Sequence, residues 1–211
     1  MFFPYGTAET EYLRMRDARL GAVIDRVGFV EREVETDFFA SLLKNIAGQQ
    51  ISNAALKTVL ARLGTLLCEY TPEKVCEVGV DALRSCGMSM RKAENIYKAA
   101  KLICEGELDV ERLREYSDAD LIAALTSLDG VGEWTAQMML IFCFCRQDVI
   151  SFGDFGIRRG IEILYGEEKL TRAKFSEYAE HYSPYASVAS FYLWKIGNGE
   201  VCISDIDFGN K

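Results

Sequence analysis

Apolar residues recur at helical spacing along most of this chain, and this periodicity constrains the fold more than any other feature. Two segments show it clearly: Phe39, Leu42, Leu43 and Ile46, and then Ile96, Ala99, Ala100 and Ile103. Spacings of three and four residues place such side chains on one face of an α-helix. No alternating apolar run bounded by hairpin turns is long enough to indicate a sheet. The sequence therefore predicts an all-α protein of about nine or ten helices.

Residues typical of helix ends divide this pattern into segments. Ser52, Ser89 and Ser117 stand where helices should begin, because a serine oxygen can accept a hydrogen bond from a free backbone N–H. Thr71-Pro72 and Ser183-Pro184 match a cap followed by the first helical residue. Glycine favours the position just after a helix. We expect helices to stop at Gly64, Gly87, Gly106 and Gly166.

The bulk composition, 49% hydrophobic and 27% charged residues, is ordinary for a folded soluble chain. No apolar run approaches the length of a membrane span, and the N-terminal stretch MFFPYGTAETEYL lacks the basic region of a secretory signal. We therefore expect no membrane contact. The expected location is intracellular: the cytoplasm, with the genomic DNA, or the nucleus if the source is a eukaryote.

The cysteines and the single histidine do not suggest a metal centre. The seven cysteines are scattered and form no Cys-x-x-Cys pair, and His181 cannot build a site alone. We expect reduced thiols and no zinc. The net charge of −8 disfavours a protein that coats DNA by charge alone. It still permits an anion site built from backbone amides, helix N-termini and a few local cations.

Two charge-rich stretches suggest where the chain divides. One is the run EREVET at residues 31–36, and the other lies near residues 146–151. We predict a central helical lobe over 36–146 and a second helical lobe formed by both termini, 1–35 with 147–211. A cleft between two such lobes is a favourable place for an active site. Nothing in the sequence requires more than a monomer.

The stretch LDGVGEWTAQM, residues 128–138, places two glycines in a turn between two predicted helices. Glycine permits positive φ and close approach of another backbone. The free amides that open the second helix then form an anion site suited to a phosphate. Taken alone, Gly-x-Gly also fits a tight corner between helices.

The full string, however, resembles the hairpin of the helix-hairpin-helix (HhH-GPD) DNA glycosylase superfamily, in which Leu-Pro-Gly-Val/Ile-Gly precedes Thr-Ala. Asp129 stands where that family usually has proline, which should loosen the turn. The resemblance implies DNA contacts at Gly130, Val131, Gly132 and Thr135. It also implies a possible sodium or potassium ion held by the backbone carbonyls of Thr126, Leu128 and Val131.

The stretch VISFGDFGIRRG carries the acid that this resemblance requires. These glycosylases have an essential aspartate about twenty residues beyond the hairpin, ahead of a helix, and Asp154 stands there. A carboxylate in that place can stabilise the oxocarbenium character of a sugar that is losing its base, or help to deprotonate the attacking water. By itself an aspartate before a helix would be read as an N-cap. Asp148 is the nearest competing acid.

Three further stretches resemble the alkylation-repair branch, closest to 3-methyladenine DNA glycosylase II. FFASLLKNIAGQQIS matches the turn that faces the DNA minor groove, which places Gln50 as the plug for an extruded base and Ser52 beside the DNA. LRSCGMSMRKAENI resembles an internal segment of that branch. SVASFYLWKIG is similar to its final helix, whose tryptophan lines the base pocket and corresponds to Trp194.

The resemblance also indicates the reaction. Trp134 occupies the place of the lysine by which bifunctional members attack the sugar, so simple hydrolysis without lyase activity is implied. The four-cysteine iron–sulfur loop of a sister branch is missing, because only Cys202 follows Asp154. We expect no required cofactor.

Aromatic residues suggest the substrate, since cationic alkylated purines are attracted to an indole face. Trp134 and Trp194 are candidate walls of the base pocket, although core packing is an equally ordinary role for both. The further pocket candidates, each also a candidate for packing, are Phe152, Phe155, Met138 and Tyr192.

The sequence therefore predicts two helical lobes with a helix-hairpin-helix and an active-site cleft between them. The expected partner is damaged double-stranded DNA with a flipped base. The expected activity is removal of alkylated purines, such as 3-methyladenine and 7-methylguanine, to leave an abasic site for base excision repair. Two alternatives stay open: a glycosylase for another damaged or mismatched base, and a non-catalytic DNA-binding module that retains the hairpin.

Overall fold

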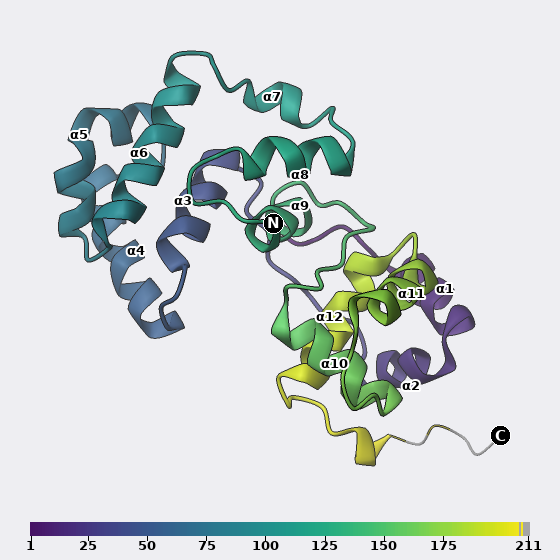
Figure 1. The fold of residues 1–211 in the computed structure, drawn as a ribbon. Coiled ribbons are helices and arrows are strands. Elements are labelled where there is room, and N and C mark those ends of the chain that lie inside the picture. The colour runs from purple at the N-terminus through teal and green to yellow at the C-terminus, as the bar shows by residue number, and fades with distance from the viewer. Residues whose placement is uncertain (207, 209–211) are drawn as a thin grey trace. The chain divides into compact units, whose positions relative to one another are not determined.

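The computed structural model describes residues 1–206 and 208, and the regular secondary structure of this part of the chain is helical (Figure 1). It contains twelve α-helices, one 3-10 turn and no β-strand, with a single isolated bridge between Phe2 and Glu33. The all-α prediction is confirmed. The expected nine or ten helices were too few, because Asp17 alone separates the first two helices and a seventh helix has only four residues. None of the described helices is long and apolar enough to cross a membrane.

The contacts divide the chain into two compact units, which we call the central unit, Glu35–Phe144, and the terminal unit, Met1–Val34 with Cys145–Lys211. The helices of the central unit are α3 (Phe38–Gly48), α4 (Asn53–Leu67), α5 (Pro72–Ser85), α6 (Met90–Cys104), α7 (Val110–Leu113), α8 (Asp118–Thr126) and α9 (Glu133–Phe142). Those of the terminal unit are α1 (Thr7–Arg16), α2 (Ala18–Val27), α10 (Phe155–Tyr165), α11 (Arg172–Tyr182), α12 (Ala186–Gly197) and the turn η1 (Ile203–Asp205).

The predicted helix starts are confirmed at the serines and at Thr71. Ser52, Ser89, Ser117 and Thr71 each accept the backbone N–H three residues ahead, at the starts of α4, α6, α8 and α5. The prediction for Ser183-Pro184 was wrong. Ser183 ends α11, and its hydroxyl donates to Asp148 instead of capping a helix.

The predicted stop at Gly64 was also wrong, because α4 continues to Leu67. One glycine costs a helix about 1 kcal/mol. Burial of Leu63 and Leu67, which are 0% and 1% exposed, outweighs that cost. Gly87, Gly106 and Gly166 do follow helices, each with a positive φ.

The terminal unit is built around α12, in which nine of the twelve residues are buried. Its neighbour α10 lies against it with backbones almost in contact (Figure 1). A Cβ at Gly160 would collide with the carbonyl oxygen of Leu193, and one at Gly197 would collide with the carbonyl oxygen of Gly156. Glycine is required at these crossing points because no side chain fits between the two helices.

We expect Gly160→Ala to destabilise the protein by about 1–3 kcal/mol, because the added methyl group meets a main-chain atom that cannot rotate away. Urea unfolding followed by circular dichroism measures this. The matched control is Gly64→Ala in α4, where a Cβ would have only Tyr70 Oη at 3.6 Å, and which should raise stability by about 0.5–1 kcal/mol. Equal effects of the two variants would contradict the close approach of α10 and α12.

Candidate active site

Asp154 is a buried acid, 9% exposed, held at the N-terminus of α10. Its Oδ1 atom accepts the backbone N–H of Ile157 at 2.9 Å and the indole N–H of Trp194 at 2.9 Å. The first bond is the ordinary bond of an N-cap residue, and the second comes from α12. Asp154 is therefore both a helix cap and an oriented carboxylate, because two donors on different helices fix one oxygen.

Trp194 reaches Asp154 because α10 and α12 are so close. A Cβ at Gly156 would lie 2.8 Å from Cδ1 of Trp194, so only glycine leaves room for the indole beside the acid. The indole ring also stacks on Phe191, with centroids 6.1 Å apart and planes at 20°, and the Arg32 guanidinium lies 5.6 Å from its centroid. The ring is thus half-buried and packed against Phe191 and Arg32, while its polar edge orients the acid.

The other aromatic candidates of the terminal unit lie in different environments. Phe152 has the guanidinium of Arg172 at 4.7 Å and that of Arg158 at 5.3 Å from its centroid. Phe155 is 68% exposed, whereas Tyr192 is fully buried. The Tyr192 hydroxyl donates to the carbonyl of Gly28, and burial raises the pKa of Tyr192.

Sequence reasoning missed Arg32 and Arg172. Arg32 lies in the charge-rich stretch that was interpreted as a boundary between lobes. No local pattern distinguishes it from its charged neighbours, because its contact with Trp194 joins residues far apart in the chain.

The predicted hairpin is present in the central unit between α8 and α9. Gly130 has φ +83°, and the N–H of Val131 donates to the carbonyl of Leu128 at 3.1 Å. Gly132 is the N-cap of α9, with no side-chain cap bond. The N-terminus of α9 therefore presents backbone amides and the positive end of the helix dipole in the way that the sequence predicted.

Asp129, which replaces the usual proline, is tied to α6 by an ion pair. Its Oδ2 lies 2.7 Å from Lys98 Nζ, with the side chains 61% and 60% exposed. The hydrogen bond from Lys98 holds the pKa of the Asp129 carboxyl below its ordinary value. The lysine thus offsets a negative charge that would otherwise repel a phosphate at the hairpin.

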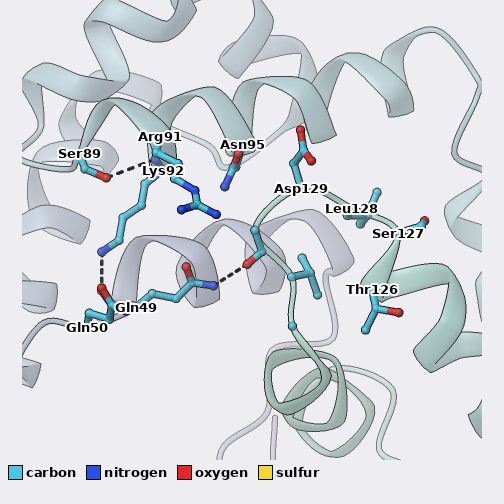
Figure 2. Close-up of a pocket in the computed structure, with 13 residues that line it drawn as sticks. Gln49, Gln50, Ser89, Arg91, Lys92, Asn95, Thr126, Ser127, Leu128 and Asp129 are labelled. Carbon is cyan, nitrogen blue, oxygen red and sulfur yellow. Dashed lines mark hydrogen bonds between the residues drawn. The ribbon is translucent and has the colours of Figure 1, made fainter.

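The hairpin borders a polar hollow of about 540 Å³, which lies entirely within the central unit (Figure 2). Its lining residues are Gln49, Gln50, Ser89, Arg91, Lys92, Asn95 and the hairpin residues from Thr126 to Gly132. Gln50 is exposed and has φ +54°. Arg91 adds local positive charge to the hollow despite the net charge of −8.

The remaining predicted residues of the central unit do not line this hollow. Ser52 caps α4 through its bond with the N–H of Ala55. On α9, Trp134 is 43% exposed, whereas Thr135 and Met138 are buried at 5% and 6%. The structure thus places Gln50, Gly130, Val131 and Gly132 around one hollow, and joins Asp154 to Trp194 in the other unit.

Comparison with known families decides the assignment, because the model of the HhH-GPD superfamily of base excision DNA repair proteins matches residues 43–184. The chain belongs to this superfamily. The match includes the hairpin and Asp154, and it confirms the resemblance found in the sequence.

Named relatives agree with this assignment. DNA-3-methyladenine glycosylase 1 of Schizosaccharomyces pombe is 30% identical over 162 residues, which are 74% of this chain and 71% of the relative. DNA-3-methyladenine glycosylase 2 of Escherichia coli is 25% identical over 169 residues, 75% of this chain and 57% of the relative.

Solved structures show the same fold. A crystal structure of DNA-3-methyladenine glycosidase from Bacillus halodurans has a TM-score of 0.84 and 32% identity, and covers 96% of both chains. The Schizosaccharomyces pombe 3-methyladenine DNA glycosylase in complex with abasic DNA has a TM-score of 0.81 and 26% identity. That match covers 93% of this chain and 98% of the relative.

The geometry of Asp154 makes a prediction about stability. Asp154→Ala removes the acceptor for two N–H donors and should cost about 1–2 kcal/mol. Asp154→Asn keeps an oxygen in the same place, so its stability should stay within about 0.5 kcal/mol of the wild type. Urea unfolding curves compare the three proteins. If alanine is tolerated as well as asparagine, the carboxylate is not anchored as described.

Proposed function

We propose that this protein is a DNA glycosylase that hydrolyses the N-glycosidic bond of alkylated purines, such as 3-methyladenine and 7-methylguanine, in double-stranded DNA. The product is an abasic site, as base excision repair requires. The observation that carries this proposal is the buried carboxylate of Asp154, oriented by Ile157 and Trp194 within the matched region of a base excision repair superfamily. The names of the relatives support the alkylated purine as substrate.

The chemistry assigned to Asp154 follows from charge. As the purine departs, the deoxyribose acquires positive character, and an anion held in a mostly buried place stabilises it strongly. The two N–H donors leave the carboxylate little freedom to rotate. Alkylated purines are already cationic and leave readily, so one oriented carboxylate with a water molecule is sufficient for hydrolysis.

The proposed reaction is monofunctional. A lyase needs an amine that forms a Schiff base with the sugar, and the residue at that sequence position is Trp134. Indole has no nucleophilic amine. Trp134 is 43% exposed on the first turn of α9, which suits a role against DNA or the damaged base.

DNA is proposed to bind the central unit through the hairpin and the neighbouring turn. The N-terminus of α9 faces a phosphate with its backbone amides, and Arg91 in the adjoining hollow adds charge. Gln50 fills the gap left by the flipped base. Because one chain supplies the acid, the hairpin and this plug, we propose that the protein acts as a monomer.

A sodium or potassium ion at the hairpin fits the residues present. Thr126, Leu128 and Val131 line the same hollow, and backbone carbonyl oxygens are the ligands that hard cations prefer. The carbonyl of Leu128 accepts the N–H of Val131, which leaves a second lone pair on that oxygen. The ion would brace the hairpin beside a phosphate and would take no part in breaking the glycosidic bond.

We expect Asp154→Asn to lower the rate of methylpurine release from methylated duplex DNA by at least about 100-fold, because the amide carries no charge. Binding to abasic-site DNA should change little. Release of free bases is measured by chromatography. The DNA product is then heated in alkali, and we expect strand breaks only after this treatment.

The matched control for that experiment is Asp148→Asn, since the Asp148 carboxylate accepts hydrogen bonds from the hydroxyl of Ser183 and the N–H of Ala186. It should retain base release. Strand breaks without alkali would contradict the monofunctional reaction. Release of other lesions instead would point to a different substrate, and DNA binding without release of any base would point to a non-catalytic module.

The hairpin makes a separate prediction. Gly130→Ala should weaken DNA binding about tenfold or more, because alanine disfavours φ +83° and its Cβ would collide with Nδ2 of Asn95. The matched control is Gly106→Ala, where φ is +74° but no atom lies within 4 Å of the new Cβ. Fluorescence anisotropy with labelled duplex DNA measures both. If the two variants lose affinity equally, the hairpin is not the DNA contact.

A further inference from the structure

One lysine side chain holds the turn that carries Gln50. The Lys92 ammonium, on the first turn of α6, donates to the carbonyl of Ala47 at 2.9 Å. It also donates to the carbonyl of Gln49 at 2.5 Å, as Figure 2 shows. Both carbonyls lie at the C-terminal end of α3, where backbone oxygens lack helical partners and attract a cation. Burial lowers the pKa of Lys92, so these two bonds offset part of the cost of placing its charge there.

The same turn is tied to the hairpin. The side-chain Nε2 of Gln49 donates to the carbonyl of Gly130 at 2.7 Å, as Figure 2 shows. Asn95, one turn beyond Lys92 on α6, packs directly against Gly130. The end of α3, the start of α6 and the hairpin therefore meet at one point.

Gln50 itself has a backbone conformation that needs this support. Its φ of +54° lies in the left-handed region, which a residue with a Cβ seldom adopts. Such a conformation persists only when neighbouring contacts impose it. The residue immediately before it, Gln49, is bound twice: Lys92 holds its carbonyl and Gly130 accepts its side-chain amide.

We infer that Lys92 is a positioning residue for base extrusion: by holding the carbonyls of Ala47 and Gln49, its ammonium presents Gln50 to the gap in the DNA. The inference rests on the proposed function, in which Gln50 fills that gap. Lys92 acts through Gln50, and it acts where the DNA lacks a stacked base. Loss of the Lys92 ammonium should therefore weaken binding to DNA that contains an abasic site, and leave the affinity for undamaged duplex DNA unchanged.

The test compares two duplexes of the same sequence, one undamaged and one with an abasic site. Lys92→Met keeps the length of the side chain and removes the charge, and should weaken abasic-site binding about tenfold while affinity for undamaged DNA changes less than about twofold. Lys92→Arg keeps a cation and should restore most of the preference. The matched control is Lys101→Met, on the same helix but paired with Glu105 outside the hollow.

A double-mutant cycle separates positioning from general stability. Gln50→Ala should reduce the abasic-site preference to a similar degree, and Lys92→Met should have no further effect in that background. If the two effects multiply instead, Lys92 does not act through Gln50, and the inference is wrong. Lys92→Gln repeats the cycle if Lys92→Met does not fold. It removes the charge and shortens the side chain, so an abasic-site preference equal to that of the wild type would likewise overturn the inference.

The same binding data distinguish two failures. If the wild type does not prefer the abasic-site duplex, Gln50 fills no gap, and both the proposed place of Gln50 in the DNA and the role of Lys92 are wrong. If the wild type shows the preference and Lys92→Met retains it, only the role of Lys92 is wrong. Equal weakening on both duplexes would reduce Lys92 to a general structural or electrostatic residue.

Discussion

The contact between the backbones of α10 and α12 is the constraint on which the terminal unit depends. Gly156, Gly160 and Gly197 remove the side chains that would separate these helices. The gain is dense packing along α12, and the consequence is geometric, because the indole of Trp194 then lies beside the first turn of α10. The orientation of Asp154 is thus set by helix packing as much as by its own loop.

Local features of the site could be predicted from the sequence, because they depend on residues close in the chain. The glycine turn before α9 and the acid before α10 each lie within a few positions of the helix start that they precede. In each, the residue type suits both the local backbone conformation and the chemistry expected there. The serine caps of α4, α6 and α8 could be predicted for the same reason, whereas the cap expected at Ser183 was wrong. The helix end predicted at Gly64 was wrong because a helix can continue through a glycine when the neighbouring residues bury enough apolar surface.

The contacts that position these residues could not be predicted, because they join distant segments. Lys92 reaches the end of α3, and Trp194 reaches Asp154 across forty positions. The residues next to a lysine or tryptophan on a predicted helix do not indicate which carbonyl or carboxylate its side chain will bind. The sequence therefore indicated the candidate site residues better than it indicated the groups that hold them in place.

The ion pair between Lys98 and Asp129 has a consequence for how DNA affinity is measured. A proline ring would stiffen the turn regardless of the solvent, whereas an ion pair more than half exposed is screened by dissolved salt. Counterions released from phosphates respond over the same range of concentrations. If the hairpin binds phosphates as proposed, the slope of log affinity against log salt combines these two ionic equilibria. The number of phosphate contacts calculated from that slope then exceeds the true number.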